Sequence, residues 1–483
     1  MKRIFMLLAA CLCLAIAPAQ QGGGMGGNSG GGMGGGSNNG MGGDMGGSAE
    51  STGSASSTGY SQSSGTNSAT GETYTSTNSD ENAVQITGGT FTMTDCTVSK
   101  PSGDTSDSDG SSFYGINSAV YCAGSSSVLN VSGGTITSSA TGANGVIAYD
   151  EGTINISDAT ITTSSNLSRG IHATGEGVIN ASNLTVTTSS TNCSVIATDR
   201  GGGTVTVNGG TYTTTGDDSA ITYSTGTITV SDATGSSSKG EISVIEGDNE
   251  ITLNNCHMTS GSSSRGMMIL QSGSGDSEGY NGVINVNGGS MTLTDSKAPL
   301  LEVPTYITAT LTLTDVTLAV PSNELMYVDY NTRWTTYGGT GILVFATDSA
   351  WEYTGDVNAD KYSTAIVKVM SGVTWNGSLD NGDKAASTSA TVNGTWVLTA
   401  DSYVDELTIE EGGTVNTNGY NLNYGTLTGT GTVTTGITSA NACAVEGDGI
   451  YTIDGKLVKT SAEKPLSLPA GIYIRGGKKI TVK

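Results

Sequence analysis

Short stretches of alternating hydrophobic and polar residues recur along most of the chain. Residues 155–190, NISDATITTSSNLSRGIHATGEGVINASNLTVTTSS, contain DATITTSS and, 25 residues later, NLTVTTSS. Each phrase is rich in Val, Ile and Thr, alternates with a period of two, and is bounded by Gly, Asn, Asp or Ser. That pattern is typical of β-strands between turns. No segment has the 3.6-residue period of an amphipathic helix, so the pattern predicts an all-β protein.

Related phrases such as TMTDCTVS, NVSGGTIT, TVNGGTYT and NVNGGSMT follow one another from about residue 81, mostly 23 to 27 residues apart. A second phrase runs between them, as in GVIAYDEG, GIHATGEG and SVIATDRG. A unit of this size contains two or three short strands and cannot bury a core alone, whereas stacked copies can. The repeats therefore predict a single-stranded parallel β-helix, a solenoid whose turns lie roughly 4.7–4.9 Å apart.

Alignment of the copies predicts which side chains face the core. One inward column consists of Val98, Ile136, Ile161, Val186, Tyr212, Gly235, Met258, Met291 and Leu318. An outward column beside it is mostly threonine and consists of Thr97, Thr135, Thr160, Thr185, Thr211, Thr234, His257, Ser290 and Thr317. In the second phrase, the alignment puts His172 in a column with Ile147 and Ile196.

The N-terminal region carries export and linker signals. Residues 1–19 combine the basic start MKR, the apolar run IFMLLAACLCLAIA and the small-residue pattern APA, which predicts a signal peptide and therefore an exported protein. Residues 20–80, first rich in Gly and Met and then in Ser and Thr, predict a flexible linker before a solenoid over 81–440. No later stretch has the roughly 18 apolar residues of a membrane helix, so no transmembrane segment is expected after cleavage.

The C-terminal tail differs from the rest. Residues 450–483 hold seven of the nineteen Lys and Arg residues. Through IYTIDGKLVK, LPAGIYI and KKITVK this tail resembles the C-terminal sorting domain of the type IX secretion system. The resemblance implies a small β module over 443–483, the type IX secretion machinery as a partner, and an extracellular or outer-surface location. The alternative is that these residues cap the open end of the solenoid.

Charge and cysteine content narrow the class of protein. The net charge of −24 disfavours nucleic acid as a partner and attracts divalent cations. We expect no cofactor, and the composition is compatible with bound calcium. Beyond the signal, the five cysteines are far apart, odd in number and without a CxxC pattern. We therefore expect buried free thiols rather than a disulfide framework or a zinc site.

The repeats resemble, in rhythm, the secreted right-handed parallel β-helices of the pectate-lyase-like superfamily. TADSYVDELTIEEGGTVNTNGYNLNYGTLTGTGTV, residues 399–433, is similar to the last turns of β-helical autotransporter adhesins. These resemblances imply a right-handed solenoid. They supply no functional residue, so function has to be argued from sites.

Carboxylates in the second phrase are the candidates for chemistry. Alignment places Asp150 with Asp199, and Glu151 with Glu176 and Arg200. Carboxylates one turn apart, at roughly 5 Å, would suit a retaining glycosidase, and the same spacing would suit calcium or a salt-bridged ladder. The catalytic candidates are Glu151, Glu176, Asp199 and Arg200, and the metal candidates are Asp150, Glu151, Glu176 and Asp199.

Aromatic residues give the binding candidates. The stretch MYVDYNTRWTTYGG, residues 326–339, packs rings beside charged groups, as glycan-binding surfaces do; the alternative is that large rings close the end of the solenoid. The ligand-binding candidates are Tyr327, Tyr330, Arg333, Trp334, Tyr337 and Trp351.

These observations predict an exported, adhesin-like β-helix that binds a polysaccharide or cell-surface glycan without catalysis. The first alternative is a polysaccharide lyase or glycoside hydrolase. A more distant alternative comes from the Thr-x-Thr columns, which resemble the faces of β-helical ice-binding proteins, although Gly235, His257 and Met291 interrupt them.

Overall fold

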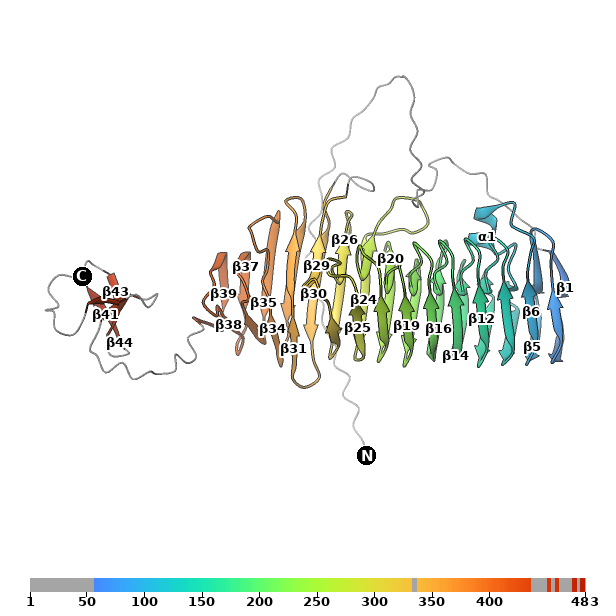
Figure 1. The fold of residues 1–483 in the computed structure, drawn as a ribbon, viewed down its shortest axis with the longest axis horizontal. Coiled ribbons are helices and arrows are strands. Elements are labelled where there is room, and N and C mark those ends of the chain that lie inside the picture. Colours follow the sequence, from blue (N-terminus) through green and yellow to red (C-terminus); the bar gives the residue numbers. More distant parts are fainter. Residues whose placement is uncertain are drawn as a thin grey trace, which may run out of the picture. The chain divides into compact units, whose positions relative to one another are not determined.

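The chain folds into stacked turns of β-strand. The computed structural model describes residues 56–331 and 337–435, together with the backbone of four strands between 450 and 482. Within these ranges the regular structure is β-strand except for the helix α1 (Ser108–Tyr114). Successive strands pair in parallel along a long solenoid (Figure 1). The protein is therefore a parallel β-helix, as the repeats predict.

One strand of most turns belongs to a parallel sheet of twelve strands, here named sheet A. In pairing order its members are β1 (Ser56–Gln62), β4 (Glu81–Ile86), β7 (Val120–Ala123), β10 (Val146–Tyr149), β13 (Ile171–Ala173), β15 (Ile196–Thr198), β17 (Thr222–Ser224), β20 (Ser243–Glu246), β23 (Met267–Leu270), β26 (Leu301–Val303), β29 (Glu324–Val328) and β32 (Asp356–Ala359).

The next part of each turn belongs to a sheet of 23 strands, here named sheet B. Its first series is β2 (Thr66–Thr70), β5 (Gly89–Thr94), β8 (Ser127–Ser132), β11 (Thr153–Ser157), β14 (Gly177–Thr188), β16 (Gly203–Thr214), β18 (Thr227–Ser231), β21 (Glu250–Asn254), β24 (Asn281–Asn287), β27 (Thr308–Thr314), β30 (Thr340–Ala346), β33 (Thr364–Val369), β35 (Ser387–Val392), β37 (Ser402–Ile409) and β39 (Leu422–Gly429). Its second series is β3 (Thr73–Thr75), β6 (Thr97–Lys100), β9 (Thr135–Ser138), β12 (Thr160–Thr163), β19 (Thr234–Ser237), β22 (His257–Ser260), β25 (Ser290–Leu293) and β28 (Thr317–Ala319).

The irregular phrases after Lys297 also form turns. From residue 351 the second series continues as a separate sheet of five strands, here named sheet C, and stacking persists to Thr434. Its members are β31 (Trp351–Thr354), β34 (Val373–Asn376), β36 (Thr395–Val397), β38 (Thr414–Asn416) and β40 (Thr432–Thr434).

The tail contains a separate antiparallel sheet. Its strands pair in the order β42 (Leu457–Lys459), β41 (Ile450–Thr452), β43 (Gly471–Arg475) and β44 (Lys478–Val482). This small sheet lies within the range predicted for the C-terminal β module.

The register of sheet B confirms the predicted inward column. Val98 pairs with Ile136, and the pairing continues in the predicted order as far as Leu318. Every member is buried except Leu318, which is half-buried. The one glycine in the column has a steric reason, because a Cβ at Gly235 would collide with Met258 Sδ. Alternation alone was therefore sufficient to identify this column of the core.

The solenoid begins earlier than the sequence phrases indicate. Strands β1 to β3 occupy residues that we predicted to be linker, so the first turn starts at Ser56. This turn is rich in Ser and Thr, which concealed it, and two tyrosines hold it on the next turn. The Tyr60 ring stacks on Phe91 with centroids 4.2 Å apart, and the Tyr74 ring meets Phe91 edge-on at 6.4 Å.

The helix α1 was also unexpected. Asp107 caps it, since its side chain accepts a hydrogen bond from the Gly110 N–H at 2.9 Å. Gly115 ends the helix in the left-handed conformation. One insertion between β6 and β7 thus forms a helix within an otherwise all-β chain.

The predicted free thiols are confirmed for the described residues, in which four cysteines are buried and unpaired: Cys96, Cys122, Cys193 and Cys256. Cys443 lies outside the described residues.

Candidate functional site

The outer face of sheet A is covered over its N-terminal half. Arg200 connects two covering segments, α1 and the loop at 271–280. Its guanidinium carbon lies 3.9 Å from the Phe113 ring centroid, and its Nη2 lies 2.5 Å from Asp276 Oδ1. The Thr174 hydroxyl also donates to the Phe113 carbonyl oxygen at 2.7 Å. These contacts bury side chains that point away from the solenoid core.

Asp199 lies beneath this cover. The register of sheet A places Asp199 opposite Thr174. The prediction that Asp199 shares a column with Asp150 is therefore wrong. The Asp199 side chain is buried, and its Oδ2 accepts a hydrogen bond from Arg169 Nη2 at 2.8 Å. Burial raises the pKa of Asp199 to about 6, and the charge of Arg169 partly offsets this rise. The pair is an internal ion pair rather than an open site.

His172 contacts the same ion pair. It pairs in register with Ile147 and Ala197, so the predicted column with Ile196 is wrong by one residue. The ring is fully buried, neither ring nitrogen has a hydrogen-bond partner, and Nε2 lies 3.9 Å from Asp199 Oδ2. Burial and the charge of Arg169 lower the pKa of His172 well below 6.5, which keeps the imidazole neutral.

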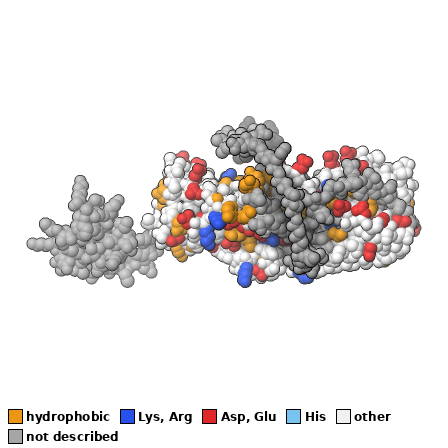
Figure 2. Space-filling view, turned by 90° about the horizontal axis from the view of Figure 1, so that it is seen from above, with side chains coloured by type: hydrophobic (Ala, Val, Ile, Leu, Met, Phe, Trp, Pro, Cys, Tyr) orange, Lys and Arg blue, Asp and Glu red, His pale blue; other side chains and the backbone are white. Residues whose placement is uncertain are grey.

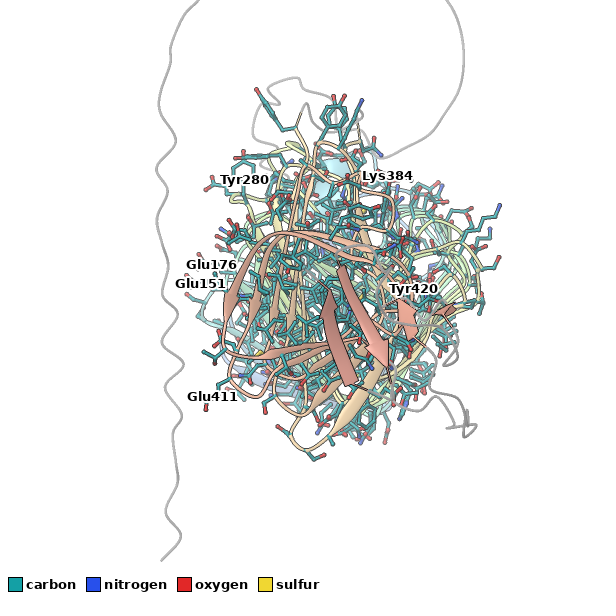
Figure 3. All side chains as sticks on the ribbon, turned by 90° about the vertical axis from the view of Figure 1, so that its left-hand side faces the viewer. Glu151, Glu176, Tyr280, Lys384, Glu411 and Tyr420 are labelled. Atoms are coloured by element: carbon teal, nitrogen blue, oxygen red, sulfur yellow. The ribbon has the colours of Figure 1, made fainter. Side chains whose placement is uncertain are left out.

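Of the remaining candidates for catalysis and metal binding, Glu151 and Glu176 share a column on adjacent turns as predicted, whereas the register of sheet A places Arg200 opposite Gly175. Glu151 and Glu176 occupy equivalent turns with φ of 63° each, and both side chains are exposed at one edge of the solenoid (Figure 3). Asp150 is exposed beside Glu151, whereas Arg200 is paired with Asp276. Among the residues that the structure describes, no group of three or more His, Cys, Asp or Glu side chains could hold a metal ion.

The predicted aromatic candidates separate into two groups. Tyr327 and Tyr330 are half-buried and Tyr337 is 68% exposed, all three near the turn that leaves β29. Trp351 begins sheet C, packs against the core, and donates its indole N–H to the Val316 carbonyl oxygen at 3.2 Å. Arg333 and Trp334 lie outside the described residues.

Four tyrosines occupy the turns between sheet A and sheet B on successive turns of the solenoid. This tyrosine ladder consists of Tyr280, Tyr306, Tyr337 and Tyr362, whose side chains are 53%, 57%, 68% and 54% exposed. Ring centroids lie 5.8 Å apart for Tyr280 and Tyr306 and 5.9 Å apart for Tyr306 and Tyr337. Tyr362 contacts Tyr330 at 4.9 Å. Hydrophobic side chains gather in a patch left of the centre of the solenoid on the face seen in Figure 2.

Sequence reasoning missed three members of the ladder. Tyr280, Tyr306 and Tyr362 each stand one or two residues before a sheet B strand. A tyrosine just before a sheet B strand was the sequence signal for the ladder. The alignment compared only the strand phrases, and it could not align the turns because their length varies from one copy to the next.

A pocket of about 530 Å³ lies on the outer face of sheet A at β29 and β32. We call it the acidic pocket, and it is lined by Glu324, Tyr327, Asp356, Asn358, Ala359, Asp360, Lys361, Ser378, Asp380, Asn381 and Lys384. It meets the ladder at Asp360 and Lys361, which directly precede Tyr362. Tyr280 and Lys384 lie toward the same side of the solenoid in Figure 3, and Glu411 lies toward the opposite side.

The aspartates of the acidic pocket also hold the turns together. Asp356 Oδ1 accepts hydrogen bonds from the N–H and the hydroxyl of Ser378, both at 2.8 Å. Asp360 accepts from the Tyr330 and Tyr362 N–H groups at 2.9 Å each. Because these bonds fix the carboxylates in place, the charge of the pocket is preorganised.

Glu324 is the carboxylate in the pocket with the most perturbed proton affinity. Asn358 Nδ2 donates to both Glu324 oxygens, at 3.1 and 2.9 Å. Burial raises the pKa of Glu324 to about 7, the Asn358 hydrogen bond opposes the rise, and the charge of Asp356 adds to it. A carboxyl group that titrates near neutrality in an accessible pocket is typical of functional sites.

A second charged cluster lies beside the pocket along sheet A. Arg265 Nη1 is 2.8 Å from Glu302 Oε2, and Arg265 Nε is 3.5 Å from Glu241 Oε1, with all three side chains at most 17% exposed. Burial raises the pKa of Glu302 to about 7, against the opposing charge of Arg265. Glu241 and Glu302 share the single positive charge of Arg265, and all three side chains are largely buried, so we assign this cluster to stability rather than binding.

Comparison of the chain with protein-family models, with curated proteins and with solved structures finds no match. The fold itself defines the class, a parallel β-helix. In the described part of the chain, no helix has the length and apolar character needed to cross a membrane.

Proposed function

We propose that this β-helix is an exported, adhesin-like protein that binds a glycan without catalysis. The observation that carries the proposal is the tyrosine ladder, with exposed rings at 5.8 and 5.9 Å on successive turns, next to the acidic pocket. Sugar rings stack on aromatic faces, and their hydroxyls bond to carboxylate and amide groups. A ladder beside a polar pocket offers both contacts.

The shape of the ladder also bears on the ligand. Adjacent rings of Tyr280, Tyr306 and Tyr337 are tilted by 58° and 61° to one another, so they form a stepped surface and not a flat one. Tyrosine loses little conformational entropy on binding, because it has only two side-chain torsions. A stepped aromatic row along the solenoid axis suits an extended polymer whose successive sugar rings are turned relative to one another.

The alternative function is a polysaccharide lyase or glycoside hydrolase, and Glu324 is the observation that favours it. Its position in β29 pairs with Asp356 in β32, one turn away. A carboxyl group with a pKa of about 7 could serve as a general acid. If the protein is an enzyme, its catalytic residues are therefore expected in the acidic pocket, and not at Glu151 and Glu176.

The test is a glycan array probed with the chain from residue 20 to residue 483, followed by analysis of each bound glycan for cleavage products. We expect Tyr306→Ala to weaken binding at least tenfold and Tyr306→Phe to retain it. The matched control is Tyr420→Ala, because Tyr420 is 43% exposed in the turn between β38 and β39. Absence of binding to any glycan would refute the proposal, and product release that Glu324→Gln abolishes would establish the enzyme.

We also infer export through the type IX pathway from the N-terminal signal and the tail. In a host that has this pathway, deletion of residues 443–483 should retain the protein inside the cell, whereas the full chain should reach the surface or the medium. Unchanged release of the shortened chain would leave the tail a structural role only.

A further inference from the structure

We propose that the glycan is cationic: an amino sugar polymer with free, protonated amino groups that lie between the tyrosine ladder and the acidic pocket. This inference rests on the proposed function and names the substrate class of the same site. Three features support it, namely the charge of the pocket, an ammonium group already seated on a tyrosine face, and the state of Glu324.

The acidic pocket carries more negative than positive charge. Its carboxylates are Glu324, Asp356, Asp360 and Asp380, and its ammonium groups are Lys361 and Lys384. The aspartates accept hydrogen bonds from the protein, which fixes their positions. The three aspartates outnumber the two ammonium groups, and Glu324 adds a further negative charge when it is ionised. An uncharged sugar would gain no charge–charge attraction from this excess negative charge, and an anionic sugar would be repelled by it.

The ladder already accepts an ammonium group from the chain itself. Lys361 Nζ lies 4.9 Å from the centroid of the Tyr362 ring, within the range of a cation–π contact. Lys361 is an exposed side chain with long flexible carbons, so a ligand amine can replace it. The same geometry is open to a ligand at the exposed faces of Tyr280 and Tyr306.

Glu324 responds to a cation in a defined way. It is packed against Asn358 and Asp356, and Tyr327, Asp360, Lys361, Asp380 and Lys384 share its pocket. Because burial holds its pKa at about 7, much of the group is neutral at neutral pH, and a bound ammonium would draw the proton off. Binding of a permanently charged ligand should therefore tighten as pH rises through 7.

The electrostatic field of the whole protein also favours a cationic ligand. The net charge of −24 raises the local concentration of cations and speeds their association. A basic peptide would profit from that field as well. The row of rings on successive turns, next to a pocket that is small for a folded partner, favours a linear polymer with one charge per repeat, and the experiment separates the two classes.

The experiment compares two ligands with one backbone: the β-1,4-linked hexamer of glucosamine and the hexamer of N-acetylglucosamine. With the full chain at pH 6 and 150 mM salt, we expect the amino form to bind about tenfold more tightly, the increment of a few charge contacts near a surface. Glu324→Gln should reduce that advantage severalfold. Glu411→Gln, which removes the same charge at an exposed site outside the pocket, should not.

Two further measurements make the test specific. Lys361→Gln should strengthen binding of the amino form, because it frees the Tyr362 face, whereas Lys368→Gln, at an exposed lysine outside the pocket, should change it little. The N-trimethylated hexamer, whose charge does not titrate, should bind more tightly at pH 8 than at pH 5.5, and Glu324→Gln should abolish that difference.

Equal binding of the amino and acetylated forms would overturn the inference and leave the proposed function intact. An equal loss in Glu324→Gln and Glu411→Gln would also overturn it, because the attraction would then be non-specific. Tighter binding of an oligolysine of equal charge would assign the site to a basic peptide, and failure of both hexamers and of all arrayed glycans would refute the proposed function too.

Discussion

Trp375 stacks on Trp396 inside the solenoid, with ring centroids 4.9 Å apart and ring planes at 14°. Each indole N–H donates to a carbonyl oxygen of the neighbouring turn, Trp375 to Gly355 at 2.8 Å and Trp396 to Gly377 at 2.9 Å. Both rings are fully buried. Trp375 and Trp396 therefore belong to the core of the C-terminal turns and offer no face to a ligand.

Replacement of one ring should destabilise this core strongly. We expect Trp396→Ala to lower the free energy of unfolding by about 3–5 kcal/mol, because it removes a buried ring and leaves a cavity. Urea unfolding followed by tryptophan fluorescence measures the change. Trp351→Phe is the control at a half-buried position, and a loss in Trp396→Ala no larger than in this control would contradict the stacked core.

His172 should make the protein sensitive to acid. Because its folded-state pKa lies well below 6.5, the unfolded chain takes up a proton below pH 6.5 that the folded chain does not, so stability falls as pH falls. We expect His172→Leu to be more stable than the parent, by about 1 kcal/mol at pH 7 and by more at pH 5. His257→Gln, at the exposed histidine, should keep the parental pH dependence; a similar change there would contradict the assignment.

Arg265 should be essential above neutral pH. Without it, Glu241 and Glu302 would be two largely buried carboxylates with no counter-charge. We expect Arg265→Gln to cost about 3–5 kcal/mol at pH 8. The loss should be smaller at pH 5, because the pKa of Glu302, already about 7, leaves that carboxyl group protonated there. Thermal unfolding at both pH values measures this.

The control for Arg265 is the exposed ion pair of Lys239 and Asp217, 3.3 Å apart. Lys239→Gln should change stability by less than about 0.5 kcal/mol at either pH. A loss in Arg265→Gln that does not depend on pH would show that the arginine acts by packing and not by its charge.

Calcium should have little effect on stability. Glu151 and Glu176 are exposed on separate turns, and Asp199 is paired with Arg169 under α1. A cation that binds only the folded state raises the melting temperature with its concentration. We expect chelation, or addition of calcium, to shift the melting temperature by less than about 1 °C. A larger shift that Glu151→Gln abolishes would restore the predicted metal site.

The threonine column should not bind ice. It is regular from Thr97 to Thr234, but His257 follows in register. Thr137, which is two residues after Thr135 and also faces outward, donates to the Val98 carbonyl oxygen at 3.4 Å, which uses its hydroxyl within the protein. Threonine is also common on solvated strands. We expect no thermal hysteresis from the full chain, and hysteresis lost in Thr185→Tyr would contradict this.

The sequence by itself determined the scaffold. Alternation with a period of two identifies inward residues because a strand places successive side chains on opposite faces, and the interval of about 25 residues sets the register of Ile161 on Ile136 and Val186. The same logic found the threonine column. It missed the first turn at Ser56, where few apolar residues mark the strands.

Only the tertiary structure decided where a site could be. Insertions of different length shift the register between turns, so Asp199 does not lie in its predicted column. The helix α1 and Arg200 cover it. The tyrosine ladder joins residues from 280 to 362 that share no phrase and meet only because the solenoid stacks their turns. The pKa of Glu324 depends on burial and on neighbours from other turns, which local sequence does not encode. Short-range alternation specifies the strands, whereas turn packing specifies the surface that they present.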